Sequence, residues 1–305
     1  MPPSPLTAWV HEQLGTAVAA HRPVGGGCIH RAWALELADG RRLFAKTNDA
    51  RQLPLLDAEA DGLTALAAAA AGDPVVPRPL HWGERDGQAL LLLEWLPLAQ
   101  GPDSGWWDLG AALARLHRRS LEQADGRFGW HRDNVIGAGP QPNGWRRRWG
   151  AFFAEQRLGA QLAWAARSGR RLEGAEALLA QVPQWLEGHG AQPCLVHGDL
   201  WSGNAGLLRA GGGAIFDPAV HWGDREVDLA MARLFGGFPR DFFSGYVREW
   251  PLPPAADGRV EVYNLYHLLN HANLFDAGPC GSYAQRAQAS ILNLLKRRRG
   301  VGASG

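Results

Sequence analysis

Lysine is scarce in this chain of 305 residues. Only Lys46 and Lys296 occur among 31 basic residues, and arginine fills every other basic position. Lys296 opens the basic run 296–299, which we interpret as a solvated helix end. Lys46 therefore stands alone in the body of the sequence. Because a compact ammonium and a planar guanidinium are not interchangeable at a phosphate, this pattern suggests that position 46 requires an amine.

The chain also has few cysteines, a net charge close to zero and no long apolar run. Cys28, Cys194 and Cys280 lie far apart without a C-x-x-C pair, which argues against a disulfide framework or a zinc site. A net charge of +1 gives no reason to expect nucleic acid or an anionic membrane as the main partner. No apolar stretch reaches the ~18 residues of a membrane span. The first residues lack the basic and apolar regions of a secretory signal, so we expect a cytoplasmic protein.

The N-terminal part of the chain predicts a β-rich lobe. Residues 6–20 have a helical pattern, and a glycine-rich turn then leads into an alternating segment within 24–37. Asp39-Gly40 favours a hairpin with a return strand over 43–47. The further elements expected here are a helix over 53–70 and strands over 80–84 and 89–96.

After Pro97 the pattern becomes mainly helical. The helices expected are 106–118, 145–168, 172–188 with a kink at Pro183, 225–235, and others up to about residue 298. Between them lies a small hairpin region with short apolar runs at 194–197, 205–209 and 214–217. The sequence thus predicts an α+β fold of two lobes, residues 1–97 and residues 98–305.

The stretch LVHGDLWSGNAG, residues 195–206, carries the first chemical signal. Asp199 and Asn204 have the D-x-x-x-x-N spacing that protein kinases use for a catalytic base and a metal-binding amide. Asp217 ends the next apolar run, and a hairpin would place it beside Asn204. A surface loop of ordinary turn formers would also contain such residues, but not this combination. Together they indicate phosphoryl transfer, which depends on positioning and charge neutralisation.

Lys46 is expected on a strand, with an acidic partner on the helix that follows. Asp57, Glu59 and Asp61 compete for this role. Glu59 shares its helical face with leucines at 56, 63 and 66, so it points inward and is our choice for the ion pair. Upstream, the three glycines 25–27 would let backbone amides approach phosphates.

The motifs GGGCIHRAW, DNVIGAGPQPNGWRRRW, HGDLWSGNAG, DPAVHWGDREVDLAM and LYHLLNHANLF closely resemble the fructosamine kinase (ketosamine-3-kinase) family. The resemblance runs from about residue 5 to residue 298. It implies a bilobal protein-kinase-like fold, of the branch that includes aminoglycoside and choline kinases. It also implies an ATP- and Mg²⁺-dependent enzyme that phosphorylates the sugar 3-hydroxyl of ketosamines, so that the amine is released.

The resemblance assigns roles to individual residues. Asp199 is the expected base, Asn204 and Asp217 are expected metal ligands, and Lys46 is expected to hold the ATP phosphates. The expected nucleotide-binding set is Gly25, Gly26, Gly27, Cys28, Lys46 with Glu59, and the backbone near Glu94 and Leu96 for adenine. His30 and His221 stand where Asn and Tyr are expected more often, and these departures bear on substrate details.

Other candidate residues have two readings. Trp201 and Trp222 flank the expected site and either stack on a sugar or fill the core. Asp133, Asn134 and Gln141 either contact the sugar or cap turns. Asp228 is expected to brace the catalytic loop. His267 and His271 have the spacing of a metal pair but lack a third ligand, so a packing role is favoured.

Two other functions remain open at this point. The same chemistry would serve another acceptor, such as an aminoglycoside or choline, although no long acidic loop for a polycation is evident. A redox-sensing pseudokinase would use Cys28, whose place beside the glycines suits a reactive thiol. The alternative interpretation is that Cys28 is simply a small apolar residue at the start of a strand. The chain is expected to be a monomer, or a homodimer linked through Cys28.

Overall fold

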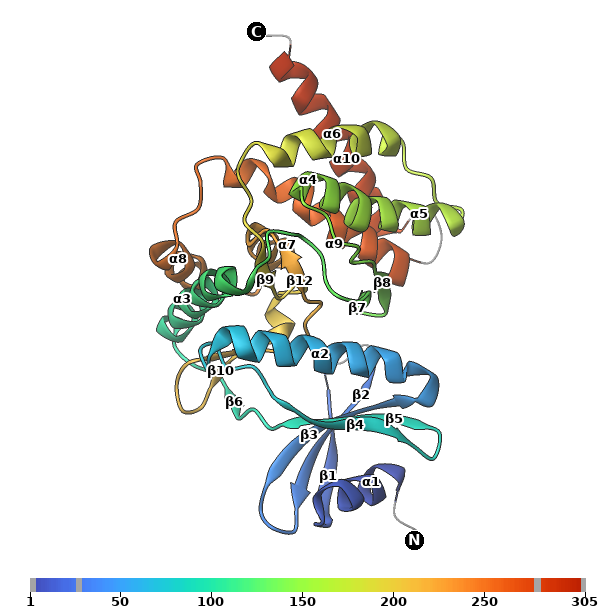
Figure 1. Cartoon of the computed structure of the whole chain (residues 1–305), viewed down its shortest axis with the longest axis vertical. Coiled ribbons are helices and arrows are strands. Elements are labelled where there is room, and N and C mark those ends of the chain that lie inside the picture. The colour runs from blue at the N-terminus through green and yellow to red at the C-terminus, as the bar shows by residue number, and fades with distance from the viewer. Residues whose placement is uncertain (1–3, 26–28, 277–280, 303–305) are drawn as a thin grey trace. The chain divides into compact units, whose positions relative to one another are not determined.

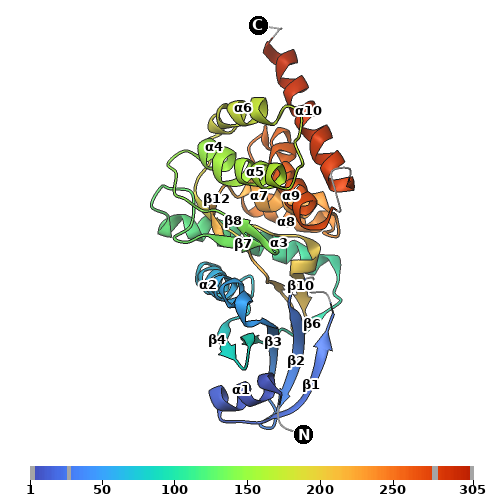
Figure 2. The same cartoon turned by 90° about the vertical axis from the view of Figure 1, so that its right-hand side faces the viewer.

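The computed structural model describes residues 4–25, 29–276 and 281–302 (Figures 1 and 2). Contacts divide the chain into two compact units. The first contains Met1–Leu116, Gly203–Pro218 and Pro239–Tyr246, and the second contains His117–Ser202, Ala219–Phe238 and Val247–Gly305. This division differs from a single boundary after residue 97, because two later segments pack with the N-terminal part. The assignment of residues 1–97 and 98–305 to nucleotide-binding and catalytic lobes stays a prediction.

A five-stranded antiparallel sheet dominates the first unit, in the order β1-β2-β3-β5-β4. Its strands are β1 (Val18–Val24), β2 (Arg31–Leu37), β3 (Arg42–Asp49), β4 (Pro79–Arg85) and β5 (Gln88–Glu94). The helical expectation for 6–20 is wrong at its end, since α1 (Pro5–Leu14) stops at Gly15, which adopts a left-handed φ of 67°. This conformation ends the helix, and the residues after it continue as β1.

Helices cover both faces of this sheet, which explains why β5 is apolar on both sides. Leu90 and Leu92 of β5 pack in one cluster with Trp9 and Val10 of α1. The opposite face meets α2 (Leu53–Ala70), which runs beside the sheet in Figure 1. Leu56, Leu63 and Leu66 of α2 are fully buried, as the helical period of the sequence predicts.

A second, three-stranded sheet of the first unit has the order β11-β10-β6. The expected hairpin of β10 (Ala205–Leu208) and β11 (Gly213–Ile215) is present, and β6 (Leu98–Ala99) extends it. The run at 194–197 does not join this hairpin. It forms β9 (Cys194–Val196), which pairs in the second unit with β12 (His221–Gly223), a strand too short for a periodic signal.

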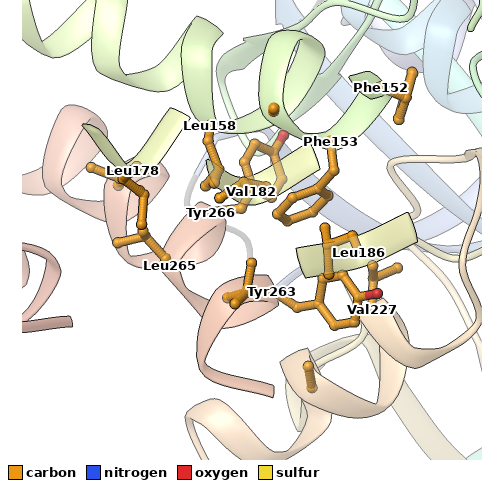
Figure 3. Packing of buried hydrophobic residues seen from close by; sticks show 14 of the residues in the cluster. Phe152, Phe153, Leu158, Leu178, Val182, Leu186, Val227, Tyr263, Leu265 and Tyr266 are labelled. Atoms are coloured by element: carbon orange, nitrogen blue, oxygen red, sulfur yellow. The ribbon is translucent and has the colours of Figure 1, made fainter. Parts of the chain in front are cut away.

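The second unit is mainly helical around one large apolar cluster. Figure 3 shows Phe153, Leu186 and Tyr263 among the side chains that fill it. The expected helix over 145–168 begins only at Trp149. A π-helix at Phe153–Gly159 interrupts it and joins α4 to α5. The other elements of this unit are α4 (Trp149–Phe152), α5 (Ala160–Arg167), α6 (Ala175–Glu187), α7 (Glu226–Leu234), α9 (Val260–Phe275), α10 (Ser282–Gly302), β7 (Asn134–Ile136) and β8 (Gly139–Gln141). Most of α3 (Asp103–Ser120) and of α8 (Arg240–Glu249) belongs to the first unit.

Within the described ranges, none of the helices combines the length and apolar character needed to cross a bilayer.

Candidate active site

Lys46 bridges two carboxylates in the first unit. Its Nζ donates to Glu59 Oε1 and to Asp217 Oδ1, each at 2.7 Å. Glu59 comes from the inward face of α2, so the ion pair predicted from helical spacing is present. Of its two competitors, Asp57 accepts a hydrogen bond from Trp82 Nε1 instead. The side chains of Lys46 and Glu59 are about nine-tenths buried, whereas that of Asp217 is 41% exposed.

Lys46 and Glu59 respond differently to burial in this cluster. Burial disfavours the Lys46 ammonium, but the carboxylates of Asp217 and Glu59 outweigh it and raise the pKa of Lys46 above its ordinary value. Burial raises the pKa of Glu59, and the ammonium of Lys46 opposes this shift. The ammonium of Lys46 therefore stays charged although it is buried, which a role in binding phosphate requires.

Asp217 and Asn204 lie side by side, as the hairpin predicts. Asn204 Nδ2 donates to the backbone carbonyl of Asp217 at 3.3 Å. The backbone carbonyl of Asn204 accepts a hydrogen bond from Phe216 N. Asp217 has a φ of 57°, a left-handed conformation that is uncommon outside glycine and is concentrated at functional sites. A carboxylate and an amide oxygen are hard ligands of the kind Mg²⁺ prefers, so these residues fit the expected metal role.

The loop that carries Asp199 belongs to the second unit and is fixed by Asp228. Both carboxylate oxygens of Asp228 accept backbone hydrogen bonds, from His197 N at 2.7 Å and from Gly198 N at 2.8 Å. Its Oδ2 also lies 3.1 Å from His117 Nε2. Asp228 therefore braces this loop through hydrogen bonds, as expected. Asp199 itself is half-buried.

Asp228 remains ionised at this buried position. Burial alone would raise its pKa, but the hydrogen bond and charge of His117, with the backbone donors, lower it below the ordinary value. His117 was not singled out in the sequence. The signal available was its place at the end of the amphipathic run LARLH, where an inward histidine follows leucines at helical spacing.

Asn134 and Gln141 are buried in an internal network of the second unit. Gln141 Nε2 donates to the carbonyl of Ala219 at 3.0 Å, and Asn134 Nδ2 donates to the carbonyl of Val220 at 2.8 Å. These bonds tie the β7–β8 hairpin to the segment that precedes β12. Asp133 accepts from the backbone N of Asn143 at 2.8 Å. A direct sugar contact by Asn134 or Gln141 would compete with bonds already made inside the protein.

The remaining expected residues lie in different surroundings. Trp201 is 37% exposed and Trp222 is half-buried, so Trp201 is not core filling. Glu94 is the last residue of β5, and its carboxylate pairs with Arg78. Leu96 follows the strand and is half-buried. Gly25 is exposed, while Gly26, Gly27 and Cys28 lie outside the described residues.

A buried polar cluster that the sequence did not reveal joins the segment after α6, the start of α7 and α9. His189 Nε2 and Tyr263 Oη both contact Asp224 Oδ2 at 2.6 Å. Glu226 has the spacing to complete a metal site with His189 and Asp224, but Arg259 binds both of its carboxylate oxygens. These contacts support an interior brace between helices.

Comparison with known proteins identifies the relatives of this chain. The sequence profile of the fructosamine kinase family matches residues 4–297. A probable ketoamine kinase of Synechocystis is 44% identical over 280 residues, which cover 92% of this chain and 91% of the relative. A probable ketoamine kinase of Escherichia coli K12 is 40% identical over 291 residues, covering 95% and 98%.

Solved structures agree with the sequence relatives. A putative fructosamine-3-kinase of Haemophilus somnus has a TM-score of 0.84 at 28% identity, covering 95% of this chain and 96% of that one. The corresponding protein of Thermobifida fusca has a TM-score of 0.82 at 32% identity, covering 95% and 98%. An aminoglycoside phosphotransferase shares only the fold, with a TM-score of 0.66 at 16% identity. The predicted α+β, protein-kinase-like fold is confirmed, and the chain belongs to the fructosamine kinase family of phosphotransferases.

Proposed function

We propose that this protein transfers the terminal phosphoryl group of ATP to the sugar 3-hydroxyl of a ketosamine. The observation that carries the proposal is Lys46 held between Glu59 and Asp217 in a member of the fructosamine kinase family. Ribulosamines and fructosamines are the proposed acceptors, either free or linked to a protein. Loss of the phosphorylated adduct from the amine would reverse glycation in the cytoplasm.

Each proposed role follows from the chemistry of the side chain. Lys46 would neutralise phosphate charge, while Asn204 and Asp217 would hold Mg²⁺, which would supply further neutralisation of the phosphate charge. Asp199 accepts the proton of the 3-hydroxyl. The hydroxyl oxygen bonds to the γ-phosphorus as the bond between that phosphorus and the β,γ-bridging oxygen breaks. ADP then leaves. The backbone near Glu94 and Leu96, with residues 25–28, is proposed to hold the rest of the nucleotide.

Trp201, Trp222 and Asp133 stay candidates for contact with the sugar. Asn134 and Gln141 act through the carbonyls they bind, as positioning residues. A homodimer through Cys28 stays a prediction.

The test is an acceptor panel assayed for ADP release, with a ribulosamine, a fructosamine, choline and an aminoglycoside. We expect turnover with at least one ketosamine. Asp199→Ala should lower kcat by about 10²- to 10⁴-fold, the usual contribution of a general base. Asp125→Ala, an exposed aspartate of the same unit, is the matched control and should retain activity. Turnover confined to choline or the aminoglycoside would reject the ketosamine assignment, and unchanged turnover in Asp199→Ala would reject the base.

A further inference from the structure

His30 lies at a polar cavity of the first unit that the proposed roles do not use. The cavity has a volume of about 580 Å³ and is lined by His30, Thr47, Asn48 and Gln88, among others. His30 is half-buried and directly precedes β2.

The strand register places His30 on the same face of the sheet as Lys46. Lys46 on β3 is directly opposite Ala32 on β2, and directly opposite residues share a face. Since side chains alternate along a strand, Asn48 shares the face of Lys46, and His30 shares that of Ala32. The contact between His30 Nδ1 and Asn48 Nδ2, at 2.9 Å, agrees with this placement.

The hydrogen bonds of Asn48 define the tautomer of His30. Asn48 Oδ1 accepts from Asp49 N at 2.8 Å, and Nδ2 donates to the carbonyl of Ile29 at 3.2 Å, so the orientation of the amide is fixed. An amide nitrogen only donates, and His30 Nδ1 must therefore accept from it. The single ring proton is left on Nε2, and no hydrogen bond joins Nε2 to a residue of the described part of the chain.

The ring is also uncharged at physiological pH. Burial and the nearby Lys46 ammonium lower the pKa of His30 to about 4, and Asp217 opposes this only in part. A neutral imidazole can donate a hydrogen bond to a phosphate oxygen. It adds no positive charge beside Lys46.

The order of residues along the sheet indicates which oxygen this donor meets. Leu43 on β3 faces Glu94, the end at which adenine is proposed to bind, and Lys46 lies three residues further along the strand. Asn48 lies two residues beyond Lys46, or roughly 6.6 Å at the usual rise of a strand. Moving from the adenine end past Lys46 therefore leads along the phosphate chain to His30.

We propose that His30 Nε2 donates a hydrogen bond to the terminal phosphate of ATP, with Asn48 fixing the tautomer that makes this possible. The proposal rests on nucleotide binding as described under the proposed function, but not on the identity of the acceptor.

The test compares the binding of AMP-PNP and ADP, with Mg²⁺, by isothermal titration calorimetry. We expect His30→Ala to weaken AMP-PNP binding about 10- to 100-fold, as for loss of a hydrogen bond to a charged group, and to change ADP binding less than about twofold. His30→Gln, which keeps a neutral donor, should recover part of this loss. Asn48→Ala should give a smaller loss with the same selectivity. His21→Ala, an exposed histidine on β1, is the control and should bind both nucleotides normally.

An equal loss for both nucleotides, or an unchanged preference for AMP-PNP, would overturn the role of His30. In case a variant fails to fold, ¹⁵N NMR of the unaltered protein provides an independent readout. The Nε2 resonance of His30 should report a protonated nitrogen that shifts with AMP-PNP and not with ADP, and a protonated Nδ1 would contradict the proposal. Ketosamine turnover is measured separately, so failure of the acceptor assignment leaves this result standing, and the reverse also holds.

Discussion

At the scale of the residue, Lys46 shows why one lysine persists in an arginine-rich chain. Its Nζ lies 2.7 Å from a carboxylate oxygen of both Glu59 and Asp217, and the residue is only 6% exposed. A guanidinium is longer and planar, and it cannot occupy the same point between two carboxylates without moving one of them.

We therefore predict that Lys46→Arg lowers kcat/KM for ATP by about 10- to 100-fold even though the charge is kept. Steady-state kinetics with varied ATP would measure this. Arg41→Lys, at an exposed pair with Asp39, is the matched control and should behave as the unaltered protein. An active Lys46→Arg enzyme would show that only the charge matters at this position.

At the scale of the element, the turn after β9 depends on a single glycine. Gly198 has a φ of 81°, and a Cβ there would lie 2.1 Å from the carbonyl oxygen of Ala219. The same two segments are joined by the hydrogen bond from Ala219 N to the carbonyl of His197. The backbone of the loop thus packs directly on the segment before β12, which leaves no space for a side chain.

We predict that Gly198→Ala lowers the free energy of unfolding by more than the roughly 1–2 kcal/mol cost of a left-handed alanine, because the clash adds to it. It should also lower kcat, since Asp199 is the next residue. Gly126→Ala separates the two effects, because Gly126 has a φ of 79° with open space around it. Urea denaturation and kinetics would measure both variants, and equal losses of stability would exclude a role for the clash.

At the scale of the whole molecule, buried neutral histidines couple stability to pH. Burial lowers the pKa of His267 to about 3 and that of His221 well below its ordinary value. Below about pH 6.5 these histidines bind protons when the chain is unfolded but not when it is folded. Stability is therefore complete above this pH and falls as the solution is acidified.

We predict a loss of about 2 kcal/mol from His267 between pH 7 and pH 5, with His221 acting in the same direction. His189 acts in the opposite direction: burial would lower its pKa, but the hydrogen bond to Asp224 raises it, so the folded state binds that proton more tightly. His189 therefore offsets part of the loss from the histidines whose pKa is lowered. Urea unfolding from pH 5 to pH 8 would measure it, with His267→Gln expected to reduce the slope. Stability that is flat or rises on acidification would contradict the prediction.

Much of the fold and of the candidate site was predictable because it depends on local spacing. Strand alternation and the helical face of Leu56, Leu63 and Leu66 predicted both Lys46 on a strand and Glu59 as its partner. The hairpin of β10 and β11 predicted Asn204 beside Asp217. The end of α1 and the start of β1 were missed because the small apolar residues that follow Gly15 fit a helix as well as a strand, although Gly15 itself is a helix-end signal.

The sequence by itself determined the family and the expected chemistry: an aspartate and an asparagine five residues apart, a lysine retained among arginines, and motifs specific to one family. Only the tertiary structure decided which residues support that chemistry. Asp228 binds backbone amides some thirty positions away, Asn134 and Gln141 turn inward, and Asn48 sets the tautomer of His30. Motif spacing and helical or strand periodicity depend on residues that are near one another in the sequence. These contacts instead join distant segments, which only the packing of the core brings together.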